Sequence, residues 1–137
     1  MPPPLNPIPP ALRDTLNRLH ATLLALHKEL LDHDRRRYEA QHGSMGAPGN
    51  VLQLVINDPW FAWLRPLTAT ISQIDEFLAS RTPRPPAEAD ALIAQTKTLL
   101  TPAEEGTPFQ RDYFRDLHES PDVASAHGHW RTLLQTL

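Results

Sequence analysis

Leucine recurs at alternating steps of four and three residues near the start of this chain. The series is Leu12, Leu16, Leu19, Leu23, Leu26 and Leu30. Because an α-helix has 3.6 residues per turn, this spacing gathers all six side chains on one side of a helix, whereas a strand would divide them between two faces. The series therefore predicts a helix from about residue 10 to about residue 41 with one continuous buried face.

Four further segments show the same periodicity. Apolar residues at steps of three and four lie on one face of segments 60–78, 86–100, 108–118 and 121–137, with 51–56 as a short helical lead-in. No segment alternates apolar and polar residues over the length of a strand. We therefore predict an all-α fold: an antiparallel up-and-down helical bundle of about four main helices and a short extra helix, forming one domain over residues 11–137.

Most of the fifteen prolines mark the borders of these helices. Four of them follow a residue whose side-chain oxygen can cap a helix, which predicts a helix start at each: Asp58-Pro59, Thr101-Pro102, Thr107-Pro108 and Ser120-Pro121. Pro66 lies inside a helical pattern and is predicted to kink or loosen that helix. Residues 1–10 are predicted to form a proline-rich extended arm, 81–86 a stiff linker, and the glycine-rich 42–50 a flexible loop.

Composition and charge narrow the class of protein. The chain has 137 residues, a formal net charge of −3 and no cysteine. Disulfides, iron–sulfur clusters, thiolate zinc sites and a cysteine nucleophile are therefore excluded. A nucleic-acid-binding protein usually carries a basic surplus, whereas the one basic run here, Arg35 to Arg37, follows two aspartates. We expect no nucleic-acid partner.

No apolar run approaches the roughly 20 residues that span a bilayer, and the first ten residues lack the basic and apolar regions of a signal peptide. We therefore expect a cytoplasmic protein without a membrane partner.

The segment NDPWFAWLRPL, residues 57–67, places Trp60, Phe61 and Trp63 within about one helical turn. Their rings would cover more than half of the helix circumference. We predict that this end of the helix is enclosed by residues 42–56 and a neighbouring helix. The alternative is that Trp63 lines a groove or a partner surface, since aromatic side chains bury much area for few lost rotamers.

Four motifs carry a resemblance to a known group of proteins. They are HDRRRYE (33–39), LQLVINDPWFAWLRPL (52–67), QIDEFL (73–78) and SPDVASAH (120–127). Together they resemble a family of small uncharacterised bacterial helical proteins that carry a DPWFAWLRPL-like motif, over most of residues 20–130. The resemblance implies a bacterial, soluble, all-helical protein, and it brings no activity, cofactor or catalytic residue.

Polar residues interrupt the predicted buried faces at two places. His33 and Arg37 continue the leucine series, and His127 lies on the apolar face of the last helix. If the first and last helices are neighbours, His33 and His127 could meet. Further members of the same polar zone would be Asp34, Tyr38, Glu39 and Asp75.

Three interpretations of this zone are open. Imidazole and carboxylate from facing helices are the usual metal ligands in bundles, and histidine also performs acid–base chemistry near neutral pH. The third interpretation is a structural polar layer that holds the helices in register. No two histidines lie four residues apart, and His127 and His129 would point about 200° apart on a helix. We therefore favour the structural layer and predict no metal, no cofactor and no catalytic residue.

These observations favour a protein-interaction or regulatory module without catalysis, which binds an unidentified protein through a helix face or the arm. The candidate ligand-binding or partner-binding residues are His33, Arg37, Tyr38, Trp63 and His127. The alternative is a small-molecule-binding or metal-binding bundle that uses His33 and His127. A homodimer through the leucine face of the long first helix is a further prediction.

Overall fold

The computed structural model describes residues 8–137, so the predicted arm over residues 1–10 lies mostly outside the described residues. This part of the chain contains six α-helices, one 3₁₀ helix and no strand, which confirms the all-α class. The elements are α1 (Pro10–His42), α2 (Pro48–Asn57), η1 (Pro59–Leu64), α3 (Arg65–Ala79), α4 (Pro86–Leu99), α5 (Pro108–Glu119) and α6 (Pro121–Leu134).

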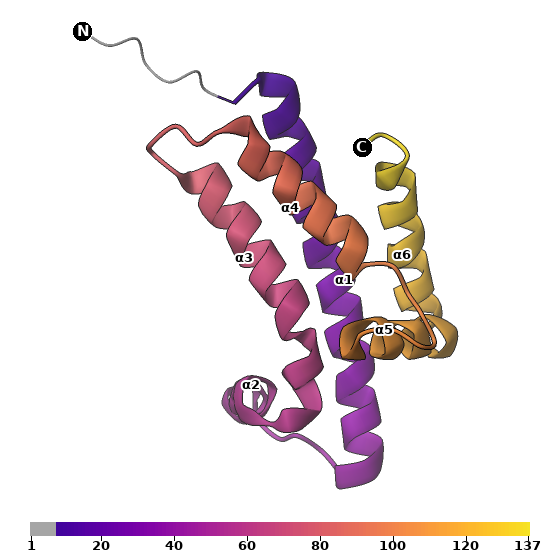
Figure 1. The fold of residues 1–137 in the computed structure, drawn as a ribbon. Coiled ribbons are helices and arrows are strands. Elements are labelled where there is room, and N and C mark those ends of the chain that lie inside the picture. The colour runs from indigo at the N-terminus through magenta and orange to yellow at the C-terminus, as the bar shows by residue number, and fades with distance from the viewer. Residues whose placement is uncertain (1–7) are drawn as a thin grey trace, which may run out of the picture.

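The long helix α1 is the axis around which the others are arranged. In Figure 1 it runs from top to bottom, while α3 and α6 run back upward on either side of it. Helix α4 packs against α3, and α5 contacts α6 and η1. Figure 1 also shows that α5 lies across the long helices and not along them. Residues of α5 can therefore reach the C-terminal third of α1, at His33, Asp34 and Arg37.

The leucine series of α1 forms the centre of the core. Leu16, Leu19, Leu23, Leu26 and Leu30 are all inaccessible to solvent. Burial of each such side chain contributes about 1.5–3 kcal/mol to folding. The next inaccessible residue on this face, one turn after Leu30, is Asp34. A carboxylate thus continues a face that is otherwise apolar.

Three of the four predicted helix starts are confirmed by their capping bonds. Oxygens of the Asp58, Thr107 and Ser120 side chains accept hydrogen bonds from backbone N–H groups in the first turns of η1, α5 and α6. The start predicted at Thr101-Pro102 is wrong, because residues 101–107 are not helical. A helix starting there would meet Pro108 after about one turn, and proline disfavours helical geometry in the residue before it.

The segment 60–78 is a single helix in the sequence prediction and two elements in the structure. The 3₁₀ helix η1 ends at Leu64, and α3 begins at Arg65. Pro66 therefore lies in the first turn of an α-helix, where the missing N–H would have no partner within the helix. The change of helix type directly before Pro66 agrees with the predicted disturbance at this residue.

The predicted loop at 42–50 is shorter than expected, because α2 already begins at Pro48. Gly43 ends α1 with a φ of 82°, a backbone conformation that favours glycine. Met45 is buried in the turn that follows, and its carbonyl accepts a hydrogen bond of 2.6 Å from the Asn50 side chain. None of the helices in residues 8–137 is long and apolar enough to cross a membrane.

Candidate functional site

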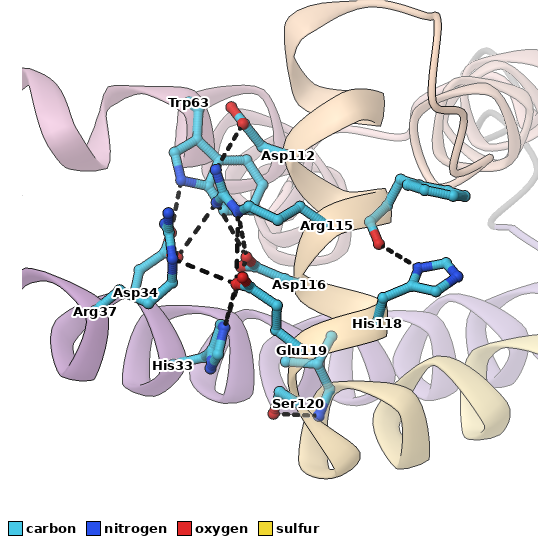
Figure 2. Close-up of polar contacts among 12 residues, drawn as sticks. His33, Asp34, Arg37, Trp63, Asp112, Arg115, Asp116, His118, Glu119 and Ser120 are labelled. Atoms are coloured by element: carbon cyan, nitrogen blue, oxygen red, sulfur yellow. Dashed lines mark hydrogen bonds and ion pairs between the residues drawn. The ribbon is translucent and has the colours of Figure 1, made fainter.

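A buried carboxylate, Asp34, connects three segments that are distant in the sequence. Its side chain on α1 is 0% exposed, and its Oδ2 accepts a hydrogen bond of 2.6 Å from the indole Nε1 of Trp63 in η1. Its Oδ1 lies 3.5 Å from Nη2 of Arg115 in α5 (Figure 2). The ring of Trp63 thus packs against the core, while its N–H donates a hydrogen bond to a buried carboxylate. Only a tryptophan combines a large apolar ring with such a donor, which explains why it occupies this position.

Arg115 is the central cation of the site. Its Nε donates to Oδ1 of Asp116 at 3.0 Å, and its Nη1 donates to Oδ1 of Asp112 at 2.9 Å. The same guanidinium also lies near Asp34 and Glu119, so it contacts four carboxylates, two of which, Asp34 and Asp116, are 0% exposed. Its carbon Cζ lies 5.7 Å from the centre of the Trp63 ring, a distance at which cation and ring attract each other.

His33 and Arg37 lie on the other side of this acidic group. His33 Nε2 is 3.1 Å from Oε1 of Glu119 and 3.8 Å from Oδ1 of Asp116. Arg37 Nε is 3.3 Å from the same glutamate oxygen, and its Nη1 is 3.4 Å from Oδ1 of Asp34. Figure 2 shows the side chains of α1 and α5 converging here. We call His33, Asp34, Arg37, Asp112, Arg115, Asp116 and Glu119 the polar cluster.

Burial and crowding change the proton affinity of the two inaccessible acids. Burial raises the pKa of Asp34, although Arg115 and the Trp63 N–H oppose this effect. Burial, together with the negative charge of Asp34, raises the pKa of Asp116 to about 8. Two carboxylates that face one guanidinium cannot both ionise freely, so the pair tends to hold one proton near neutral pH.

The structure places the five predicted site residues in three different surroundings: the polar cluster, an aromatic group around Tyr38, and a separate contact of His127. The structure brings His33, Arg37 and Trp63 into or against the polar cluster. Tyr38 instead packs in an aromatic group, with ring centroids 4.4 Å from His42 and 5.7 Å from both Trp60 and Phe61. This packing accords with the prediction that the aromatic segment is enclosed.

His127 has a partner of its own. Its Nδ1 lies 2.5 Å from the hydroxyl of the buried Tyr113 on α5. Burial lowers the pKa of His127, and Arg131 acts in the same direction, so the neutral imidazole is favoured. Although α1 and α6 are neighbours, His33 and His127 have different partners. The proposed pairing of these two histidines therefore has no support in the contacts of residues 8–137.

A further cavity lies elsewhere, between α3, α4 and the start of α5. It has a volume of about 570 Å³ and is lined by small and uncharged residues, among them Ala69, Ala91, Ala94 and Gln95. None of the five predicted site residues lines it. A smaller cavity of about 200 Å³ does contain Arg37 and Trp63, together with Trp60, Asp112 and Arg115.

Comparison with known proteins gives no further guidance: no family model matches the chain, and no curated protein or solved structure matches it.

Sequence reasoning missed the contribution of α5 to this site. Phe109, Tyr113 and Asp116 are the buried residues of that helix and follow one another at steps of four and three. The periodicity that predicts the apolar face of this helix would therefore also have predicted that Asp116 is buried. The prediction did include Asp34 on α1 in the polar zone, but it considered no polar residue of α5.

Proposed function

We propose that this chain is a protein-interaction module without catalysis, and that its docking surface is formed by α2 and the groove beside it. The observation that carries the proposal is the exposure of α2. This helix contains Val51, Leu52, Leu54, Val55 and Ile56, yet none of its residues is buried. Leu52 is 58% exposed and Ile56 is 55% exposed. Large apolar side chains gathered on an exposed helix are typical of a binding surface.

A groove of about 410 Å³ extends this apolar surface toward α1 and α3. Its lining residues are His27, Val55, Ile56, Phe61, Leu64, Arg65, Thr68, Ala69 and Ser72. The lining contains one arginine and one histidine but no carboxylate. Leu24, which is 46% exposed, lies one turn before His27 on α1 and continues the apolar surface beyond the groove.

The occupant that fits this surface is an amphipathic helix of another protein. Such a helix places side chains at steps of three and four into an apolar groove, and Leu52 and Ile56 offer a face with the same spacing. Because Arg65 is the one residue of the lining with a permanent charge, the partner helix should carry acidic residues at the edge of its apolar face. A helix as short as α2, about 15 Å long, matches two to three turns of a partner.

The proposal can be tested by placing a photo-crosslinking amino acid at Ile56 and irradiating the full chain in extract of its source organism. The crosslinked segment should be an acidic amphipathic helix. The purified partner should then bind the wild-type chain with one-to-one stoichiometry in calorimetry. Ile56→Asp and Arg65→Glu should each weaken this binding at least about tenfold, whereas Arg81→Glu, the same charge change at an exposed site in the 80–85 connection, should leave it unchanged.

Two results would contradict the proposal. Crosslinks only between copies of this chain would identify the surface as a homodimer interface. A partner that binds Ile56→Asp and wild type equally well would place the interaction on another face.

The cellular setting belongs to the same proposal. A bacterial cytoplasmic protein is supported by the four sequence motifs and by the absence of cysteine, and the net charge of −3 argues against nucleic acid as the partner.

A further inference from the structure

Three members of the polar cluster form a cage of the size that a metal ion needs. One nitrogen of His33 and one carboxylate oxygen each of Asp116 and Glu119 all lie within 4.8 Å of one another. Two edges of this triangle measure 3.1 Å, from His33 to Glu119, and 3.8 Å, from His33 to Asp116. A tetrahedral ion with bonds of about 2.0–2.2 Å separates its ligand atoms by about 3.3–3.6 Å, so the observed edges bracket the required value.

The second observation is a buried oxygen without a partner. Asp116 is 0% exposed. Its Oδ1, the atom that lies 3.8 Å from His33 Nε2, accepts the hydrogen bond from Arg115, whereas its Oδ2 is buried and has no hydrogen-bond partner. A buried carboxylate oxygen without a partner is costly in a native protein, and a bound ion is one of the usual ways to satisfy it.

The charge of the surroundings also favours a cation. The polar cluster contains four carboxylates, on Asp34, Asp112, Asp116 and Glu119, and two guanidiniums, on Arg37 and Arg115. Once an incoming ion displaces the proton that Asp34 and Asp116 share, the four carboxylates exceed the two guanidiniums by two negative charges. One divalent cation balances this excess.

We propose that His33, Asp116 and Glu119 bind a divalent transition-metal ion such as Zn²⁺. One imidazole nitrogen and two carboxylate oxygens are ligands that suit zinc and its first-row neighbours. Glu119 is 44% exposed, so the ion can enter from solvent and keep a water molecule in the remaining position. Arg37 and Arg115 contact Glu119 and Asp116 and hold the two carboxylates in place, as outer partners of metal ligands commonly do.

This site does not involve α2 or the groove, so it is independent of the docking surface. Sequence reasoning considered His33 as a metal ligand but paired it with His127. It did not find Asp116 and Glu119, which lie about 80 residues away on α5, whereas His127 contacts Tyr113.

The test uses the full chain, purified without a histidine tag and stripped of metal with a chelator. Titration with ZnCl₂ in a calorimeter should show one binding site per chain. Glu119→Gln should weaken binding at least about tenfold, and His33→Ala should weaken it further. His129→Ala, which removes an exposed histidine of α6 outside the cluster, should bind as the wild type does. Zinc should also raise the Tm of the wild type and not that of Glu119→Gln.

Circular dichroism of each variant checks that it is folded. If His33→Ala does not fold, Glu119→Gln still tests the proposal, because it changes a side chain that is 44% exposed and keeps its shape. Absence of stoichiometric zinc binding by the wild type would overturn the proposal. Equal affinity of the wild type and Glu119→Gln would overturn it as well, since the ion would then be bound elsewhere on the surface.

Discussion

Removal of the Arg115 guanidinium should destabilise the fold more than any other single charge change in α5. Arg115→Met keeps an unbranched side chain at this position but leaves Asp34 and Asp116 without the guanidinium they share. Loss of one partner from a buried ion pair costs about 3–5 kcal/mol. The contact with the partly exposed Asp112 adds less than about 1 kcal/mol.

The raised pKa of Asp116 determines where the loss of stability in Arg115→Met should fall within the range of about 3–5 kcal/mol. Because its pKa is about 8, much of this carboxyl is already neutral at pH 7, so we expect a loss near the lower limit, about 3 kcal/mol. The cost should be smaller at pH 5 than at pH 7, because Asp116 is then more fully protonated and needs the cation less. Urea unfolding followed by tryptophan fluorescence measures both values.

The matched control for this prediction is Arg111→Met, on the same helix at an exposed position, which should change the free energy of unfolding by less than about 0.5 kcal/mol. A loss below about 1 kcal/mol for Arg115→Met, or a loss that grows as the pH falls, would refute this explanation of the polar cluster.

Two further predictions concern single residues. In the presence of a metal chelator, the free energy of unfolding should fall as the pH rises from about 4 to about 8, by up to about 1.4 kcal/mol per pH unit. Folding raises the pKa of Asp116 to about 8, so the stabilisation from its bound proton is complete below the pKa of the unfolded state and is lost as the pH rises through the pKa of the folded state. An unchanged slope of stability against pH in Asp116→Asn would disprove this. Gly128→Ala should raise the free energy of unfolding by about 1 kcal/mol, because a Cβ on this helical glycine meets no atom within 4 Å. Gly106→Ala should lower it, because its Cβ would lie 2.5 Å from the Gln110 Oε1 that caps α5. Thermal unfolding compares the two variants, and a loss of stability in Gly128→Ala would argue against open space at that position.

Much of the fold could be predicted from the sequence because local rules decide it. The leucine spacing gives α1 nearly to its end residues, and the caps at Asp58, Thr107 and Ser120 give the starts of three helices. The error at Thr101 shows the limit of such a rule. A capping side chain permits a helix start but does not supply the uninterrupted residues that a helix needs.

The polar cluster could be predicted only in part, because it depends on how the helices cross. His33 and Arg37 were recognised as polar residues that continue the apolar face of α1. Their partners on α5 could not be inferred, because no pattern within one helix indicates that α5 lies across α1 and not beside it. The same lack of long-range information led to the hypothesis that His33 meets His127.

A double-mutant cycle between Asp34 and Trp63 tests most directly whether a buried carboxylate joins α1 to η1. Asp34→Asn, Trp63→Phe and the double variant are compared with the wild type by urea unfolding at pH 7. The 2.6 Å hydrogen bond between the indole N–H and the carboxylate predicts a coupling energy of at least about 1 kcal/mol. Losses that add within about 0.3 kcal/mol would show that the two side chains do not interact, and would contradict the arrangement of the polar cluster described above.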